Sequence, residues 1–302
     1  MSHIVFFLVP GVHLLDLAGP AQVFSTADDF GHPYTLSYVA ERAQVPTAQG
    51  LPLLAGTDWP ELSADDLIVV PGWRTGTFAD VPAIGTASLQ ALRDHHDRGG
   101  TVASVCAGAE ALGQAGLLDD RHCTTHHEVQ DTLALRYPRA TVVRDVLYTT
   151  DDRVITSAGI ASGIDLALHL VATRHGPAVA AQVARNMVVY ARRNGHESQS
   201  SAMLRHRSHL DDTVHRAQDL IDARFDQPLP LPGLASAVGV SERTLTRLFG
   251  SATGLTPLRY QQTLRLERAE YLISHGTTIA AAARSVGFED PRMLRRLRAR
   301  RP

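Results

Sequence analysis

The sequence predicts two domains of different classes: an α/β domain built on a parallel sheet sandwiched by helices, and an all-α C-terminal domain with two helix-turn-helix units. In residues 1–193, uniformly apolar strands alternate with helical segments, which is typical of a parallel sheet covered on both faces. From residue 209 onward the pattern is helical, without strands. There, a short Ala-rich helix, a Gly-containing turn and a capped second helix occur twice, which is the helix-turn-helix pattern.

Apolar runs bounded by Gly, Pro and Asp define the elements of the first domain. We expect a hairpin over 45–54 and strands over 4–9, 34–40, 66–70, 101–105, 141–143, 146–150 and 153–157. We expect helices over 14–24, 89–98, 109–115, 164–173 and 178–193. The polar stretch that follows contains Gly195, so we expect a linker over 194–208.

The second domain is expected to span 209–302. Its helices are predicted over 210–225, 234–238, 242–253, 257–274, 279–286 and from 290 to the end. Ser241 and Asp290 are the expected N-caps of the two helices that follow the turns, because short side-chain oxygens accept hydrogen bonds from free helical amides.

Length and composition allow two globular domains and exclude a membrane span. The chain has 302 residues, of which 44% are hydrophobic, yet no run of eighteen apolar residues occurs. The apolar N-terminus lacks a basic region and a cleavage site, so it is predicted to be a strand and not a signal peptide. Two cysteines, Cys106 and Cys123, cannot form a disulfide scaffold and favour a cytoplasmic location.

Charge is divided unequally along the chain. Residues 203–302 carry a net charge of +6 and residues 1–202 a net charge of −8, which together give the overall value of −2. All 29 basic residues are arginines. A basic C-terminal third beside an acidic body indicates a segment that binds a polyanion, and double-stranded DNA is the expected partner; a solvated basic surface is the alternative.

The stretch 101–112 has the pattern of a nucleophile elbow. A buried strand ends at Val105, Cys106 follows, and Ala107 and Gly108 are small enough for a tight turn into the next helix. The N-terminus of that helix would favour the thiolate form of Cys106. The alternative is an ordinary buried cysteine, which behaves as a small hydrophobic residue.

Three features lie at the carboxyl ends of predicted parallel strands, where ligands bind in such sheets. They are Asp16, the Gly72–Trp73 pair and Cys106. We therefore expect a pocket at this edge of the sheet. Trp73 could offer a cation–π face there, although a single Trp is more often a packing residue.

The second helix of each helix-turn-helix unit is predicted to be amphipathic and to enter a major groove. Its apolar side is formed by Leu245, Leu248 and Phe249 in the first unit and by Leu294 and Leu297 in the second. The opposite side is free to contact bases or phosphates and carries Arg243, Thr246, Arg247, Arg292, Arg295 and Arg296.

Residues 209–302 resemble the AraC/XylS DNA-binding domain. The resemblance rests on Val240-Ser-Glu-Arg-Thr-Leu-Thr-Arg-Leu-Phe249, Thr253-Gly-Leu-Thr-Pro257, Arg265-Leu-Glu-Arg-Ala269 and Ala283-Arg-Ser-Val-Gly-Phe288. It implies two helix-turn-helix units joined by the long helix 257–274, inserted into successive major-groove segments. One departure is Arg298, which replaces an aromatic core position of the family; a closing segment of the family is also missing.

Residues 1–193 resemble the PfpI-like, class I glutamine-amidotransferase-like superfamily, which implies a flavodoxin-like fold. The resemblance rests on Asp16-Leu-Ala-Gly-Pro20, Val70-Pro-Gly72, Ser104-Val-Cys-Ala-Gly108, Gly116-Leu-Leu-Asp119, Thr124-Thr-His126 and Thr156-Ser-Ala-Gly-Ile-Ala-Ser-Gly-Ile-Asp165. Joined to an AraC-type tail, this is the arrangement of GlxA-type transcriptional regulators.

The resemblance implies a transcriptional activator that senses an amine, amino acid or quaternary ammonium compound and acts as a homodimer with RNA polymerase. Asp16, Gly72, Trp73, Cys106, Ala107 and His126 are the expected ligand-binding residues. We expect no metal, cofactor or membrane partner. The alternative is a cysteine-dependent hydrolase or isonitrile-hydratase-like enzyme with Cys106, His126 and Asp16 as catalytic residues. Ala107 weakens that alternative, because the hydratase-like branch usually carries a hydroxyl there.

Overall fold

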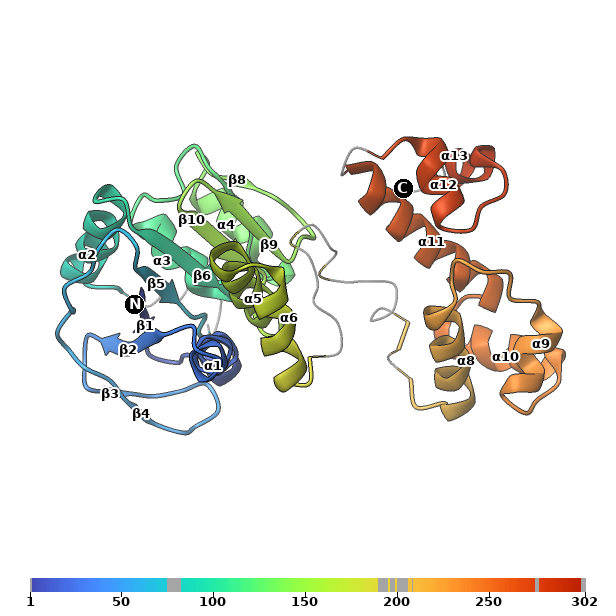
Figure 1. Cartoon of the computed structure of the whole chain (residues 1–302), viewed down its shortest axis with the longest axis horizontal. Helices are drawn as coiled ribbons and strands as arrows, with labels where there is room; N and C mark the ends of the chain where they lie inside the picture. The colour runs from blue at the N-terminus through green and yellow to red at the C-terminus, as the bar shows by residue number, and fades with distance from the viewer. Residues whose placement is uncertain are drawn as a thin grey trace. The chain divides into compact units, whose positions relative to one another are not determined.

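The computed structural model describes residues 2–74, 83–189, 195, 199, 206–207, 209–274 and 277–299 (Figure 1). The chain folds into two compact units, Met1–Gln199 and Ser200–Pro302, and each is described by itself. Most of the expected linker, 194–208, lies outside the described residues. The part of the chain that is described contains no helix with the length and apolar character that a membrane crossing needs.

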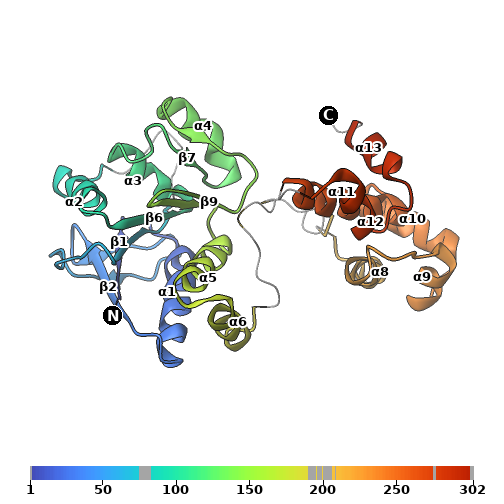
Figure 2. The same ribbon diagram turned by 45° about the horizontal axis from the view of Figure 1, so that its top comes forward.

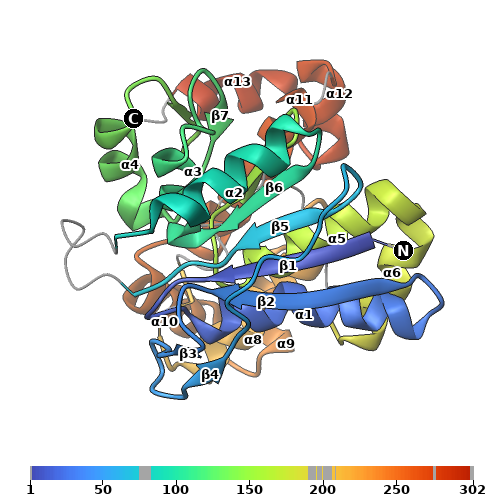
Figure 3. The same ribbon diagram turned by 90° about the vertical axis from the view of Figure 1, so that its left-hand side faces the viewer.

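The first unit is built on a mostly parallel sheet, as predicted. In its described part, six strands follow the order β2 (Tyr34–Ala40), β1 (Ser2–Leu8), β5 (Leu67–Val70), β6 (Thr101–Val105), β10 (Val154–Ser157) and β9 (Tyr148–Asp151). The first five are mutually parallel, and β9 runs antiparallel to β10. This is the flavodoxin-like strand order with one added edge strand, and Figure 3 shows β2, β1, β5 and β6 side by side.

Helices cover both faces of this sheet because its strands are apolar on both sides (Figure 2). Along β1, Ile4, Phe6 and Leu8 face one layer, and Val5 and Phe7 face the other. The first layer contains α1 (Leu14–Asp29), α5 (Ser162–His175) and α6 (Pro177–Asn186). The second contains α2 (Thr86–Asp97), α3 (Ala109–Gln114) and α4 (Gln130–Arg136).

Several helices differ in length from the prediction, and α1 and α6 differ most. Helix α1 continues past Phe24 to Asp29 with Pro20 inside it, since Val23, Phe24 and Ala27 bury one side against the sheet. Helix α6 ends at Asn186, where the prediction extended it to 193; residues 190–193 lie outside the described residues. The hairpin of β3 (Gln44–Val45) and β4 (Leu53–Leu54) is confirmed. Strand β7 (His122–Cys123), which pairs with β8 (Thr141–Val142), and helix α4 were not predicted.

The described part of the second unit is helical. Its elements are α8 (Asp212–Ala223), α9 (Leu231–Ala237), α10 (Glu242–Thr253), α11 (Pro257–Ser274), α12 (Ile279–Ser285) and α13 (Pro291–Ala299). Two apolar clusters hold it together, one around Phe249 and Tyr260 and one around Phe288 and Leu294. Helix α11 contributes to both clusters, which confirms the prediction of one long helix joining two units.

Candidate functional site

Cys106 occupies a strained corner between β6 and α3, as the elbow pattern predicts. Its φ is +55°, a left-handed conformation that is uncommon outside glycine. Gly108 is required two residues later, because a Cβ atom there would lie 2.0 Å from the Val70 carbonyl oxygen. The tight approach of the corner to β5 therefore fixes where the cysteine lies.

Two glycines enclose the cysteine closely. A Cβ atom at Gly72 would lie 2.5 Å from Asp16 Oδ2, 2.7 Å from Cys106 Cβ and 2.9 Å from the Ala107 nitrogen. A Cβ atom at Gly159 would lie 2.2 Å from Cys106 Cβ and 2.9 Å from its Sγ. The structure thus brings Asp16, Gly72, Cys106 and Ala107 together at the carboxyl ends of the strands; that they bind a ligand stays a prediction.

Asp16 is a buried acid beside the thiol, on the first turn of α1. Its side chain belongs to a residue with 0% exposure, and Oδ1 accepts a hydrogen bond of 2.7 Å from the Ile160 amide. Oδ2 is buried and has no hydrogen-bond partner of ordinary geometry among the described residues. Burial raises the pKa of Asp16, and the Ile160 amide and the charge of His13 offset only part of that rise.

The burial of Cys106 counts against the expected thiolate form. Burial raises the pKa of the Cys106 thiol far above its ordinary value, and the nearby negative charge of Asp16 raises it further. The Ala107 amide at the start of the helical segment lowers it, but by less. Cys106 is only 8% exposed, so its burial and the neighbouring acid both disfavour ionisation of the thiol.

His126 lies in the loop next to the elbow. Thr125 Oγ1 donates a 2.8 Å hydrogen bond to the Cys106 carbonyl oxygen, which holds this loop against the corner. The His126 ring packs on His127 with 4.2 Å between centroids, and its Nδ1 accepts from the Glu128 amide at 3.5 Å. Burial and then the charge of His127 lower the pKa of His126. No hydrogen bond between His126 and the thiol is found among the described residues, so the geometry lacks an assembled nucleophile–base pair.

Trp73 does not present its ring to the pocket. The residue is 2% exposed and belongs to the apolar layer beneath α2 and α3. A β-bridge to Val12 fixes its backbone, which directs the side chain into that layer. The cation–π expectation for Trp73 is therefore corrected to a packing role. Among the described residues, no group of three or more potential metal ligands occurs.

Helix α10 has the predicted division into a buried and an exposed side. Leu245 and Phe249 have 0% exposure, whereas Arg243 and Arg247 are exposed and Thr246 is half-buried. Ser241 caps the helix by accepting a 3.2 Å hydrogen bond from the Thr244 amide, which confirms the expected N-cap. Within the described part of the chain, neither arginine forms an ion pair.

Helix α13 repeats this arrangement in the second helix-turn-helix unit. Leu294 has 0% exposure, and Arg292, Arg295 and Arg296 are exposed and outside any ion pair formed by described residues. Asp290 accepts a 2.8 Å hydrogen bond from the Arg292 amide, as the capping prediction expects. The Arg298 side chain, which replaces an aromatic residue of the AraC/XylS pattern, bonds Glu270 on α11 at 2.9 Å. An ion pair thus anchors α13 where the resemblance implies apolar packing.

Sequence reasoning missed two positioning features. Arg265 on α11 donates hydrogen bonds to the carbonyl oxygens of Phe225 (2.6 Å), Gly287 (2.7 Å) and Gln227 (2.8 Å). It therefore ties the segment between α8 and α9 to the turn of the second helix-turn-helix unit, and its place in a motif of the resemblance was the available signal. The second missed feature is Gly159, which lies against Cys106. Its position just after the end of β10 could have indicated this role.

Comparison with known proteins gives two family matches. Residues 2–173 match the DJ-1/PfpI family, and residues 234–301 match a helix-turn-helix domain. The HTH-type transcriptional regulator CdhR of Pseudomonas aeruginosa is 30% identical over 296 residues, which cover 95% of this chain and 84% of CdhR. Isonitrile hydratase of Pseudomonas putida is 32% identical over 168 residues, covering 55% of this chain and 68% of the hydratase.

Solved structures agree with the first match. The crystal structure of an AraC family transcriptional regulator from Pseudomonas putida has a TM-score of 0.53 and 25% identity, and covers 62% of this chain and 100% of that chain. The sheet order, the elbow at Cys106 and the two capped helix-turn-helix units agree with these matches. The chain therefore belongs to the DJ-1/PfpI family and, within it, to the GlxA-type AraC-family regulators, which join this domain to a C-terminal helix-turn-helix domain.

Proposed function

We propose that this chain is a DNA-binding transcriptional regulator whose DJ-1/PfpI domain binds a small metabolite beside Cys106. The observation that carries the proposal is the exposed side of α10 and α13. It presents five guanidinium groups outside any ion pair of the described residues, while the apolar side of each helix is buried in its own core. Guanidinium groups free of carboxylates are available for guanine edges and phosphates.

DNA recognition would use both helix-turn-helix units of one chain. Arg243, Arg247 and Thr246 on α10 would contact one major-groove segment, and Arg292, Arg295 and Arg296 on α13 the next. Arg265 would hold the second helix-turn-helix unit against the segment between α8 and α9 through its three backbone carbonyl partners. We propose that the regulator acts as a homodimer on paired half-sites, and that it activates transcription through RNA polymerase.

The sensing pocket would take a small cation or zwitterion. Asp16 supplies a buried carboxyl group beside the thiol, and the ammonium group of an effector would pair with its negative charge. Gly72 and Gly159 have no side chains, which lets their backbone approach the cysteine and the acid closely. Amines, amino acids and quaternary ammonium compounds are the effector classes that fit this acid.

The DNA-binding part is tested by fluorescence anisotropy of the full-length protein on DNA from its own upstream region. Substituting Arg247→Ala should weaken specific binding by roughly 1–3 kcal/mol. Arg216→Ala is the matched control, since Arg216 lies on α8 and pairs with Asp212 on its own helix. Equal affinities for the wild type and Arg247→Ala would refute the assignment of α10 as a recognition helix.

The sensing part is tested by thermal shift. Small amines, amino acids and quaternary ammonium compounds are screened against the wild type and Cys106→Ser. A compound that raises the melting temperature of both proteins without being consumed supports a sensor. If no compound of these classes raises either melting temperature, the effector class is wrong.

Cysteine chemistry is the second candidate function, and the strained elbow favours it. A φ of +55° at Cys106 and an acid beside its thiol are features that an active nucleophile would use. The raised pKa of the thiol and the apolar side chain of Ala107 count against it. Turnover of an isonitrile or amide that disappears in Cys106→Ser would favour the enzyme over the sensor.

A further inference from the structure

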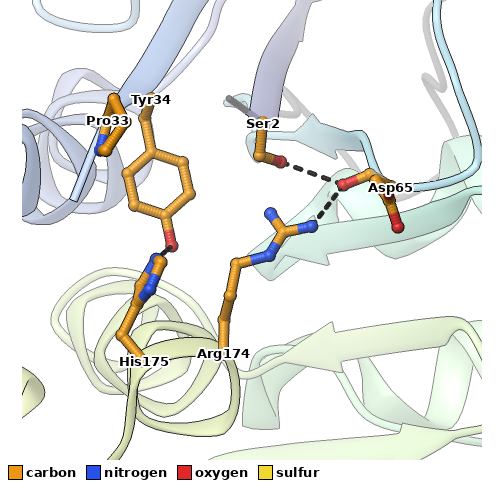
Figure 4. A pocket seen from close by; sticks show the side chains of 6 residues that line it. All are labelled: Ser2, Pro33, Tyr34, Asp65, Arg174 and His175. Carbon is orange, nitrogen blue, oxygen red and sulfur yellow. Dashed lines mark hydrogen bonds between the residues drawn. The ribbon is translucent and has the colours of Figure 1, made fainter.

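A second cavity lies at the edge of the sheet opposite to Cys106. Parallel strands β1, β2 and β5 begin at this edge, and helix α5 ends there. Figure 4 shows the residues around its mouth, which are Ser2, Pro33, Tyr34, Asp65, Arg174 and His175. Because β1 starts at Ser2 and Cys106 follows the end of β6, the length of the sheet separates this cavity from Cys106.

The cavity consists of two adjoining hollows, of which the second is lined by more apolar residues. The mouth encloses about 230 Å³, and an adjoining hollow of about 280 Å³ shares Tyr34, Asp65 and Arg174 with it. Ile4, Phe24, Leu67 and Leu170 line the second hollow, together with the polar residues Asp66, Thr101 and Thr173. Dimensions of this order suit a small ligand with a short apolar part.

Arg174 is held at the mouth with donors to spare. Its Nη2 donates a 2.7 Å hydrogen bond to the Asp65 backbone carbonyl, which also accepts from Ser2 Oγ at 2.9 Å (Figure 4). A guanidinium has five N–H groups, and no carboxylate forms an ion pair with Arg174 within the described ranges. The side chain is thus positioned by a neutral acceptor and keeps its charge available.

Tyr34 and His175 complete the polar mouth. The Tyr34 hydroxyl and His175 Nε2 lie 2.9 Å apart. Burial raises the pKa of Tyr34, and the charge of Arg174 partly offsets this. The phenol is therefore neutral, and it lies close enough to Arg174 for the two groups to interact electrostatically. When His175 donates to the Tyr34 oxygen, the hydroxyl proton is free for another acceptor.

We infer that this cavity binds a small monocarboxylate with a short apolar tail. The carboxylate would pair with Arg174, as planar carboxylates do with guanidinium groups, and would accept a hydrogen bond from Tyr34. The tail would lie against Phe24 and Leu170. The nearby Asp66 does not compete for Arg174, because its oxygens accept from the His3 amide at 2.7 Å and from the Ser63 amide at 2.7 Å.

This site would give the protein a ligand input separate from the one at Cys106. Arg174 and His175 form the last residues of α5, and α5 packs on α6, which precedes the segment between the two units. Occupation of the cavity would replace water around the end of α5 by a charged contact. The ligand class also differs, since the Cys106 pocket offers an acid and this cavity offers a guanidinium.

Calorimetric titration of the full-length protein tests the inference. The probes are butyrate and benzoate, with butylammonium as the matched cation and inorganic phosphate as an anion without an apolar tail. Either carboxylate should bind the wild type, Cys106→Ser and Arg185→Gln, the last being the same change at an exposed arginine of α6. Arg174→Gln should weaken binding roughly tenfold or more, because it removes a charge-assisted pair.

Four outcomes would overturn the inference. They are no binding of either carboxylate, equal affinity in Arg174→Gln, loss of binding in Cys106→Ser, and tighter binding of butylammonium or phosphate than of the carboxylates. If Arg174→Gln does not fold, Tyr34→Phe decides the matter, since it keeps the ring and removes only the hydroxyl. It should weaken carboxylate binding several-fold, and unchanged binding would contradict the proposed pose.

Discussion

Replacing Arg265 by Met should loosen the second helix-turn-helix unit while leaving the first intact. The substitution keeps an unbranched apolar stem and removes the guanidinium that bonds three backbone carbonyls. Of these, Phe225 O and Gln227 O also accept from Gln261 Nε2, at 3.0 and 2.8 Å. Gly287 O, in the turn between α12 and α13, loses its charged donor.

The magnitude follows from these partners. Gly287 is partly buried, so leaving its carbonyl without a donor costs about 1–2 kcal/mol, toward the lower end of the range for a buried group, and the loss of two further charge-assisted bonds to carbonyls that keep another partner adds a smaller amount. The guanidinium also lies 5.6 Å from the centroid of the Phe288 ring, a contact worth about 0.5–1 kcal/mol. Because Arg265 is half-buried, we take about 2–4 kcal/mol for the whole substitution.

Native-state hydrogen exchange of the full-length protein measures this local cost. Amides of α12 and α13 should exchange about 30- to 700-fold faster in Arg265→Met, which corresponds to 2–4 kcal/mol at a factor of ten per 1.4 kcal/mol. Amides of α9 and α10 should change much less. Arg259→Met is the control, because Arg259 is an exposed arginine on the same helix.

Two results would refute the reasoning. If the amides of α12 and α13 exchange at the wild-type rate, Arg265 does not stabilise the second helix-turn-helix unit. If all helices of the C-terminal unit accelerate equally, the two units open together and Arg265 is an ordinary core contact. On DNA, the expected companion result is a footprint shortened to the segment that α10 contacts.

Three further predictions concern burial, space and charge. Asp16 has a raised pKa in the folded protein, so the stability of the wild type falls as pH rises above the unfolded pKa of about 3.9. The melting temperature of Asp16→Asn, measured relative to the wild type, should therefore increase from pH 4 to pH 7. A difference that stays constant over this range would contradict the burial of the charge. Gly159→Ala places a Cβ 2.2 Å from that of Cys106 at a φ of +97° and should cost about 3 kcal/mol or more in urea unfolding. Gly254→Ala, in a left-handed conformation with φ +72° and nothing within 4 Å, should cost only about 1 kcal/mol. Equal costs for the two substitutions would refute the packing argument. Glu270→Gln breaks a half-exposed pair with Arg298 and should lower stability by at most about 1 kcal/mol in thermal unfolding; a larger loss would mean that the pair replaces the family's aromatic contact in full.

The sheet could be predicted from sequence because its strands are short, uniformly apolar and bounded by turn residues. Strand β2, for example, has the predicted bounds Tyr34–Ala40. Strand β7 has only two residues, one of them an exposed histidine, and helix α4 buries only Gln130 and Leu133. Neither segment has enough apolar periodicity to be recognised, since tertiary contacts and not the local pattern define them.

The expectation that ligands bind at the carboxyl ends of parallel strands predicted one site and missed a second cavity. It located Asp16, Gly72 and Cys106 correctly because parallel strands bring their carboxyl ends to one edge. The charge state of Cys106 could not be predicted, since it depends on how deeply the thiol is buried and on the distance to Asp16. The Arg174 cavity escaped this expectation because it lies at the amino ends of the strands.

The hydrogen bonds of Arg265 and Arg298 show a different limit. Both arginines look like surface charges in the sequence, and one occupies a position where the resemblance expects an aromatic residue. Arg265 instead bonds backbone carbonyls of two distant loops, and Arg298 bonds an acid on α11. Such contacts depend on how helices cross, which the pattern of a single helix does not record.

The salt dependence of DNA affinity tests the central claim most directly. We expect the dissociation constant of the full-length wild type for its upstream DNA to rise by roughly 10³-fold or more between 50 and 200 mM salt, because guanidinium groups on paired recognition helices release counterions from six or more phosphates. A dissociation constant that stays flat across this range would contradict the account of this chain as a DNA-binding regulator.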